Sequence, residues 1–264
     1  MMSKESCKMD MCNGPVLQKV IAFSLPLMLS SCLQLLFNAA DVIVVGRFAG
    51  STSLAAVGST TELLSLLTTL FIGFSIGANV NVARTLGNQD DQGTKDGVHT
   101  AISVSILSGS AMILLGFLFG RPMLQWMGTP ADVIDKASLY LMIIFIGMPS
   151  NMAYNFGSAI LRAMGDTKRP LYFLSVAGVL NVVLNLIFVI VLHMDVAGVA
   201  LATILSETLS AVLILNCLCR TDGPCHLNIR KLYIQKDQLI RMLRIGLPAG
   251  IQSGMFSGSI PKFV

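Results

Sequence analysis

The sequence predicts an all-α membrane protein, a six-helix transmembrane bundle followed by the start of a seventh helix. Hydrophobic residues make up 54% of the 264-residue chain and charged residues only 12%, whereas soluble domains carry about 25% charged residues. The apolar residues gather in runs of roughly 20, the length that a helix needs to cross the hydrocarbon core. These runs are continuous rather than alternating, which favours helices over the strands of a membrane barrel.

Six complete runs follow one another along the chain. They cover approximately residues 17–44, 54–82, 98–119, 138–161, 171–192 and 196–218. A seventh run begins near Leu239, and we expect it to be incomplete. The expected segments are an N-terminal tail (1–15), a six-helix bundle (16–219), a linker (220–238) and an incomplete first helix of a second lobe (239–264).

The positive charges predict how the bundle is oriented in the membrane. With the N-terminus in the cytosol, the segments predicted to lie outside carry only Arg47, Arg121 and Lys136, whereas the inside segments carry most of the 18 Lys and Arg. Cytoplasmic loops are enriched in Lys and Arg. The N-terminus lacks the features of a cleaved signal peptide, since its first apolar run is too long. We therefore predict a multi-pass protein of the cell membrane with a cytosolic N-terminus and the lipid bilayer as its surroundings.

Several other classes of function are disfavoured by what the sequence lacks. It has no G-x-x-x-x-G-K-[ST] loop for ATP and no H-E-x-x-H or G-x-S-x-G motif for hydrolysis. The basic residues are not interleaved with aromatic ones, which disfavours nucleic acid as a partner. Cys217, Cys219, Cys225 and His226 do not match the spacing of structural zinc sites. We expect neither an enzyme nor a cofactor, and no metal other than a coupling Na⁺ at Asp41.

The first and seventh runs resemble each other. The segments VIAFSLPLMLSS and MLRIGLPAGIQS align Pro26 with Pro248, and each has a basic residue seven positions before its proline. Chance similarity between two apolar runs is the alternative to an internal duplication of a six-helix unit. Parallel repeats of this kind are a common plan among secondary transporters. On the duplication hypothesis, a second six-helix half is a partner of this one.

Polar residues within the runs define a candidate ion-coupling site. Asp41 is a carboxylate at the end of the first run, and ionisable groups in spans indicate function. Asn181 and Asn185 are four residues apart, so both amides lie on one helix face. At about 1.5 Å per residue, these amides lie roughly 15 and 21 Å above the inner surface. Thr203 lies roughly 10 Å below the outer surface of a core about 30 Å thick. Asn181, Asn185 and Thr203 therefore share one layer, and Asp41 lies near or slightly above it. Desolvation raises the pKa of a carboxylate, and a nearby cation lowers it.

Four further residues are candidates for lining a substrate cavity. They are Gln34, Asn38, Asn155 and Glu207. Gln34 and Asn38 lie on roughly the face of the first helix that carries Asp41. The alternatives are that the asparagines only join helices, and that Asp41 pairs with Arg47 near the outer surface.

Two loops and the first helix carry a family resemblance. ARTLGNQDDQG (83–93), LRAMGDTKRP (161–170) and LPLMLSSCLQLLFNAADVIVVGRFAGSTSLAAVG (25–58) resemble the MATE (multidrug and toxic compound extrusion) antiporters, most closely the DinF-like branch. The resemblance implies half of a twelve-helix, two-lobe transporter, with a central cavity that opens alternately to each side. It implies organic cations or drugs as substrates, exchanged for Na⁺ or H⁺.

The resemblance also implies roles for particular residues. It carries over Asp41, Asn181 and Thr203 as ion-site residues, and it marks a departure at Asn185, where related transporters often have aspartate. We expect a cation-coupled antiporter present as an N-terminal fragment. The alternatives are an inactive truncated protein or scaffold, and, less favoured, a flippase for lipid-linked precursors, for which the spans carry too few basic residues.

Overall fold

The computed structural model describes residues 16–259, so the predicted N-terminal tail (1–15) and the last residues of the predicted seventh segment (260–264) lie outside the described part. The described chain is helical and contains no strand. The helices are α1 (Val16–Phe48), α2 (Ser51–Gly87), α3 (Asp91–Trp126), α4 (Ile134–Ala163), α5 (Lys168–Leu186), α6 (Asp195–Cys219) and α7 (Lys236–Ser259). Two short elements, the π-helix η1 (Ile187–Val191) and the 3-10 helix η2 (Ile229–Lys231), complete the list.

The six predicted spans are confirmed as helices long and apolar enough to cross a membrane. Most helices extend beyond the apolar runs, because their first and last turns are polar and hydropathy does not detect them. The third begins at Asp91 rather than near Val98, and the seventh at Lys236 rather than near Leu239. In both, an acid occupies the first turn, Asp91 or Asp237, where the partial positive charge of a helix N-terminus favours it.

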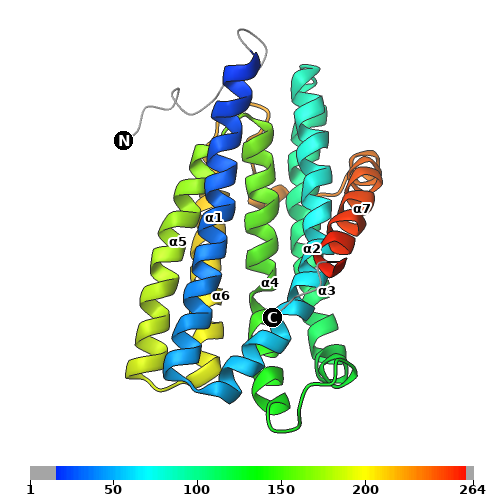
Figure 1. Ribbon diagram of the computed structural model, residues 1–264. Helices are drawn as coiled ribbons and strands as arrows, with labels where there is room; N and C mark the ends of the chain where they lie inside the picture. Colours follow the sequence, from blue (N-terminus) through cyan, green and yellow to red (C-terminus); the bar gives the residue numbers. More distant parts are fainter. Residues whose placement is uncertain (1–15, 260–264) are drawn as a thin grey trace.

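Helix α4 is the centre of the bundle. It packs against α2, α3 and α6, while α5 lies at one side of the bundle and packs against both α1 and α6 (Figure 1). Two clusters of buried apolar side chains run along α4, one built around Phe145 and one around Phe156. The other spans turn much of their apolar surface outward, including Leu35 and Val179, as expected for helices surrounded by lipid.

One close approach fixes how α1 lies on α5. A Cβ placed on Gly178 would lie 1.8 Å from the ring of Phe37, so only glycine leaves room for this ring. Small residues let helices come together in lipid, where the hydrophobic effect supplies no attraction between them. The contact sets the position of α1 one turn from Asp41.

The two loops that carry the family resemblance are helix caps. The Asp90 carboxylate accepts a hydrogen bond of 2.8 Å from the backbone N–H of Gly93 at the start of α3. Asp166 does the same at the start of α5, accepting from the backbone N–H of Arg169 at 3.1 Å and pairing with its guanidinium. Such caps satisfy backbone N–H groups that have no partner within the helix. These loops therefore turn the chain at one end of the bundle and lie outside the spans.

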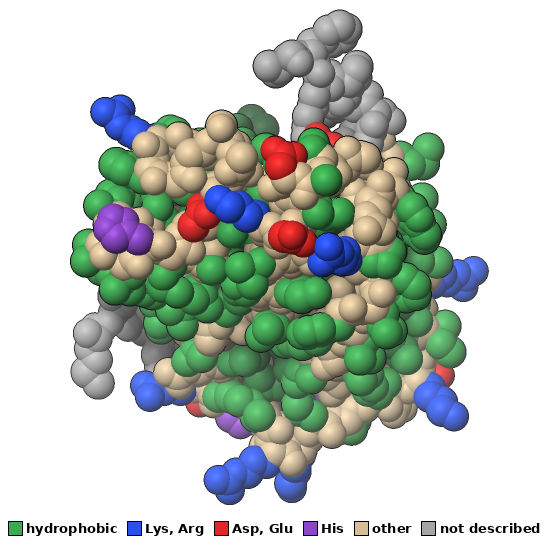
Figure 2. Space-filling model, turned by 90° about the horizontal axis from the view of Figure 1, so that it is seen from below, with side chains coloured by type: hydrophobic (Ala, Val, Ile, Leu, Met, Phe, Trp, Pro, Cys, Tyr) green, Lys and Arg blue, Asp and Glu red, His purple; other side chains and the backbone are tan. Residues whose placement is uncertain are grey.

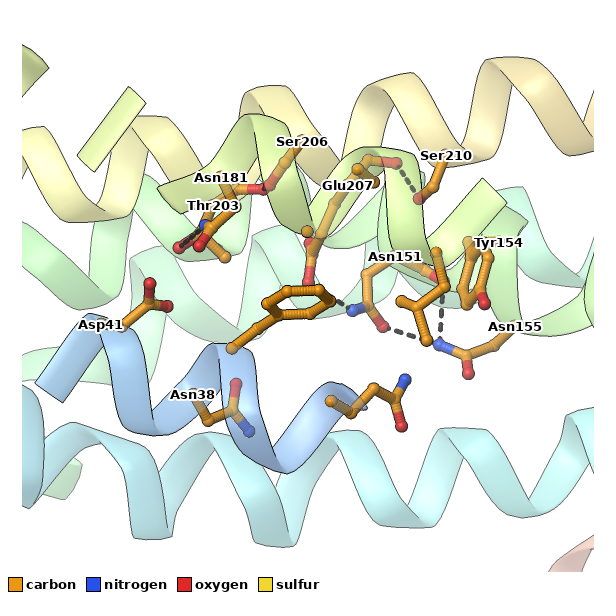
Figure 3. Close-up of a pocket in the computed structure, with 15 residues that line it drawn as sticks. Asn38, Asp41, Asn151, Tyr154, Asn155, Asn181, Thr203, Ser206, Glu207 and Ser210 are labelled. Carbon is orange, nitrogen blue, oxygen red and sulfur yellow. Dashed lines mark hydrogen bonds between the residues drawn. The ribbon is translucent and has the colours of Figure 1, made fainter. Parts of the chain in front are cut away.

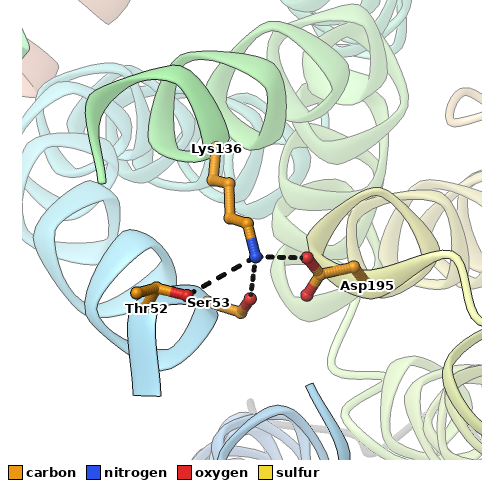
Figure 4. A network of polar contacts seen from close by, with 4 residues as sticks. All are labelled: Thr52, Ser53, Lys136 and Asp195. Carbon is orange, nitrogen blue, oxygen red and sulfur yellow. Dashed lines mark hydrogen bonds and ion pairs between the residues drawn. The ribbon is translucent and has the colours of Figure 1, made fainter. Parts of the chain in front are cut away.

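At the opposite end, Lys136 joins three helices. Its Nζ donates to Asp195 Oδ2 at 2.6 Å, to Ser53 Oγ at 2.9 Å and to Thr52 Oγ1 at 3.5 Å (Figure 4). These contacts connect the first turns of α4, α6 and α2. Figure 2 looks at this end and shows acidic and basic side chains side by side among apolar ones. The sequence analysis placed Lys136 only among the basic residues of the segments predicted to lie outside. Its partners were not predicted, because they belong to helices far apart in the chain.

The linker between α6 and α7 folds back onto α3. The rings of Tyr233 and His99 stack with centroids 5.2 Å apart, and the Tyr233 hydroxyl donates to Asp96. The backbone N–H of Asn228 donates to His99 Nε2 at 3.3 Å, and that of Gln235 to Thr100 Oγ1 at 3.0 Å. Burial and the Asp96 carboxylate raise the pKa of Tyr233 to about 12. The linker is thus an ordered part of this end of the bundle.

Helix α7 crosses α2 at unusually short range. A Cβ on Gly73 would lie 2.3 Å from the backbone of Gly250, and one on Gly246 would lie 2.7 Å from the backbone of Phe74. The crossing therefore uses glycines of both helices.

Candidate functional site

A polar cavity of about 300 Å³ lies between α1, α4, α5 and α6. Figure 3 shows Asp41, Asn181 and Thr203 at one end, Asn151, Tyr154 and Asn155 at the other, and Glu207 between them. The two ionisable acids of the cavity, Asp41 and Glu207, come from α1 and α6. Among the described residues that line it, none is Lys or Arg.

The four predicted ion-coupling residues form one hydrogen-bonded chain. The Nδ2 group of Asn185 donates both to the Asp41 carboxylate and to Asn181 Oδ1, the latter at 3.2 Å. Asn181 Nδ2 in turn lies 3.5 Å from Thr203 Oγ1. The structure thus brings together residues of α1, α5 and α6. Their role in ion coupling stays a prediction.

The direction of these hydrogen bonds follows from the chemistry of the carboxylate. An ionised carboxylate only accepts, so the Asn185 amide presents its nitrogen to Asp41. Asn185 is fully buried, and its Oδ1 has no hydrogen-bond partner among the described residues. Buried amide oxygens are rarely left in this state. The amide nitrogen of Asn185 therefore lies between two oxygens, and its own oxygen is unsatisfied.

The local fold explains why α5 carries this pair. Asn181 and Asn185 lie one turn apart and both are buried. Asn181 faces Thr203 of α6, and Asn185 faces Asp41 of α1. The helix then passes into the π-helical turn η1, beginning two residues after Asn185. Such turns often accompany functional sites. On α6, Thr203 keeps its backbone partner by donating to the Val199 carbonyl at 3.0 Å.

The other end of the cavity holds a second polar group that sequence reasoning identified only in part. Asn151 Nδ2 donates to Glu207 Oε1 at 2.8 Å, and Asn155 Nδ2 donates to Asn151 Oδ1 at 2.9 Å. Glu207 and Asn155 were predicted for the cavity, but Asn151 was missed. Its position four residues before Asn155, on the same helix face, was the available signal.

The remaining predicted residues are also placed by the structure. Gln34 and Asn38 line the cavity from α1, as predicted. Asn185 is fully buried and is not among the residues that line the cavity. Arg47 lies six residues beyond Asp41, about 240° around the helix, and is exposed, while Asp41 turns toward Asn185.

A polar cavity enclosed by helices of membrane-spanning length is the architecture of a multi-span membrane transporter. The MatE family model matches residues 26–187 of the chain. The probable multidrug resistance protein YpnP of Bacillus subtilis (strain 168) is 31% identical over 255 residues, which cover 95% of this chain and 56% of YpnP. The chain belongs to the MatE family.

Solved structures agree with this assignment. A MATE crystallised in the bent conformation has a TM-score of 0.84 and 27% identity, covering 90% of this chain and 53% of that one. An outward-facing multidrug resistance MATE family transporter of the MOP superfamily has a TM-score of 0.83 and 27% identity, and the match covers 89% of this chain and 52% of that one. This chain therefore spans about half the length of the relatives that it matches. Its assignment to the DinF-like branch stays a prediction.

Proposed function

We propose that this chain is the first half of a cation-coupled antiporter that exports drug-like organic cations by alternating access. The observation that carries the proposal is the hydrogen-bonded chain from Asp41 through Asn185 and Asn181 to Thr203 at one end of the cavity. Half of a two-lobe transporter needs a second six-helix half, which we propose as its partner. The distribution of Lys and Arg supports placing the protein in the cell membrane with its N-terminus in the cytosol.

The donor atoms at this end suit a small hard cation. Na⁺ prefers oxygen ligands, and Asp41, Asn181 and Thr203 offer a carboxylate, an amide oxygen and a hydroxyl. The Asn185 nitrogen lies between the Asp41 carboxylate and the Asn181 oxygen, the place where a cation would contact both. Rotation of the Asn185 amide about its last torsion would turn its nitrogen away and bring its unsatisfied Oδ1 toward a cation held by these two oxygens. A fourth oxygen ligand is therefore available without any movement of the backbone.

A proton is the alternative coupling ion. Among the four ion-coupling residues it would bind at Asp41, because the amides and the hydroxyl do not titrate in this range. In either case the bound cation or proton neutralises the negative charge of the Asp41 carboxylate. This neutralisation is favourable because an ionised group within a membrane span is costly.

The charge of the cavity favours cationic cargo over anionic cargo. Its ionisable groups are two carboxylates, and the lining side chains described include no Lys or Arg. A flippase for lipid-linked phosphates would need the opposite, since phosphate groups are recognised by basic side chains. YpnP is described as a probable multidrug resistance protein, which agrees with drug-like substrates.

Transport by reconstituted protein tests the proposal. The chain is placed in proteoliposomes, alone and together with the part of YpnP beyond the region that it matches. Ethidium movement is then followed under an imposed Na⁺ or pH gradient. We expect gradient-dependent ethidium transport that Asp41→Asn abolishes. Asp135→Asn, the same change at an exposed acid outside the cavity, is the matched control and should behave as wild type. Absence of transport in both arrangements, or full activity of Asp41→Asn, contradicts the proposal.

A further inference from the structure

A second carboxylate lies in the cavity one helical turn from the ion-coupling residues. Glu207 follows Thr203 by four residues on α6, so both side chains lie on one helix face and both line the cavity. In Figure 3 the Glu207 side chain lies between Asn181 and Thr203 on one side and Asn151 on the other. The backbone carbonyl of Glu207 accepts from Ser210 Oγ at 2.8 Å, which ties the same turn of α6 together.

The protein supplies an amide and no positive charge to this carboxylate. The hydrogen bond from Asn151 Nδ2 is neutral, and the described lining residues include no Lys or Arg. Charged groups in the membrane are expensive, and most are paired with an opposite charge. Glu207 is thus placed to receive its counter-charge from a ligand in the cavity.

The groups around Glu207 suit an organic cation better than a metal ion. Because a carboxylate only accepts, Asn151 must turn its nitrogen toward Glu207, and its oxygen accepts from Asn155. The amide oxygen that a small hard cation would need is therefore turned away from Glu207. At the Asp41 end the Asn185 amide also turns its nitrogen toward the carboxylate, but its own oxygen has no partner among the described residues, and the Asn181 oxygen and the Thr203 hydroxyl lie in the same hydrogen-bonded chain.

The walls beside Glu207 also match the body of an organic cation. Phe37 and Tyr154 line the cavity with aromatic rings, and Leu174 adds an apolar surface. The Tyr154 hydroxyl lies 3.4 Å from the Pro170 carbonyl, so its polar end already has a partner. Aromatic faces attract ammonium groups, and about 300 Å³ is the lower end of the usual range for small-molecule pockets.

We propose that Glu207, held by Asn151, is a second cation subsite that binds the ammonium group of the transported compound, while Asp41 serves the coupling ion. The inference rests on the proposed function and divides the cavity into two parts. Asn151 is a positioning residue that fixes the carboxylate of Glu207 against the aromatic walls.

Binding by two ligands of equal shape tests the division. Phenyltrimethylammonium and tert-butylbenzene differ in charge but hardly in size, and their binding to the purified full chain is measured by calorimetry. We expect Glu207→Gln to weaken binding of phenyltrimethylammonium by about tenfold or more, the usual consequence of removing one partner of a desolvated charge pair. Binding of tert-butylbenzene should change little. Glu62→Gln makes the same chemical change on the exposed surface of α2 and should affect neither ligand.

A second measurement separates this subsite from the coupling site. Binding of ²²Na⁺ should be lost in Asp41→Asn and should change far less in Glu207→Gln. Asn151→Leu should weaken phenyltrimethylammonium binding in the same direction as Glu207→Gln. If Glu207→Gln does not yield folded protein, Glu207→Met, an apolar side chain of similar length, replaces it.

Unchanged phenyltrimethylammonium binding in Glu207→Gln would overturn the proposal, and so would equal losses of both ligands. An equal loss of ²²Na⁺ binding would also overturn it, because Glu207 would then belong to the coupling site. Failure of the proposed function looks different. The wild-type chain would then bind phenyltrimethylammonium through Glu207 yet show neither Asp41-dependent Na⁺ binding nor gradient-driven transport.

Discussion

Asn185 donates a hydrogen bond from its side-chain nitrogen to the Asp41 carboxylate, joining α5 to α1 within the bundle. Position 185 was predicted to be a departure from the MATE antiporters, since related transporters often have aspartate there, and an amide changes what this contact can do. Two carboxylates would repel each other without a cation between them. An amide instead donates to Asp41, and at the proposed ion-coupling site it would compete with an incoming cation.

The first prediction concerns this competition. Replacing Asn185 with Leu leaves the Asp41 carboxylate without its partner, so the folded chain should lose about 1 kcal/mol of stability. Its affinity for Na⁺ should also fall, because the loss of the proposed fourth oxygen ligand outweighs the relief from competition. Thermal unfolding in detergent and ²²Na⁺ binding measure the two effects. Asn216→Leu, at an exposed position of α6, is the matched control. Tighter Na⁺ binding by Asn185→Leu would show that the amide only obstructs the site.

The second prediction concerns the contact of α1 with α5. Gly178→Val should displace the Phe37 ring, move α1 away and lower the melting temperature, because a Cβ at this position has no room. Phe37→Ala in the same chain should restore part of the loss. Gly58→Val controls for the β-branched side chain itself, since a Cβ there meets nothing within 4 Å. A double variant no more stable than Gly178→Val alone would contradict this explanation.

The third prediction compares two ion pairs at the same end of the bundle. Lys136 and Asp195 are about two-thirds buried and share their network with Ser53, whereas Arg121 and Asp135 are mostly exposed. Lys136→Met should therefore destabilise the chain by about 1 kcal/mol or more, and Arg121→Met by less, as is usual for surface pairs. Chemical or thermal unfolding of the two variants gives the comparison. Equal losses would mean that the link between α2, α4 and α6 adds nothing.

The fourth prediction concerns the linker docked on α3. Loss of the His99–Tyr233 stack should free residues 220–235 and speed tryptic cleavage after Arg230 and Lys231, because cleavage requires local opening. Tyr233→Ala should show this increase. Tyr233→Phe, which keeps the ring but not the hydroxyl bond to Asp96, should show a smaller one. Identical cleavage rates in all three proteins would indicate that the linker opens independently of this contact.

The fifth prediction concerns orientation in the membrane. In a cysteine-free chain, Asp132→Cys lies in the connection between α3 and α4, and Ile229→Cys lies in the linker, both at exposed positions. A membrane-impermeant maleimide applied to intact cells should label the first and not the second. The reverse pattern would place the N-terminus outside.

The amino-acid sequence determined the number, type and approximate length of the helices. Continuous apolar runs leave a lipid-embedded chain no alternative to helix, because every backbone group must be satisfied internally. It also predicted that Asn181, Asn185 and Thr203 lie at a similar depth with Asp41 near them, since depth follows from counting residues along a helix. The helix ends were predicted less accurately. Helix α7 begins at Lys236 rather than near Leu239, and hydropathy misses this first turn because it is polar.

Only the tertiary structure decided which faces of these helices meet. The partnership of Glu207 with Asn151, the link from Lys136 to Asp195 and the docking of Tyr233 on His99 each join segments distant in the chain. Helical periodicity shows which residues share a face of one helix, but not which other helix covers that face. That choice depends on close contacts such as Phe37 against Gly178, whose shapes fit only when the whole bundle is assembled.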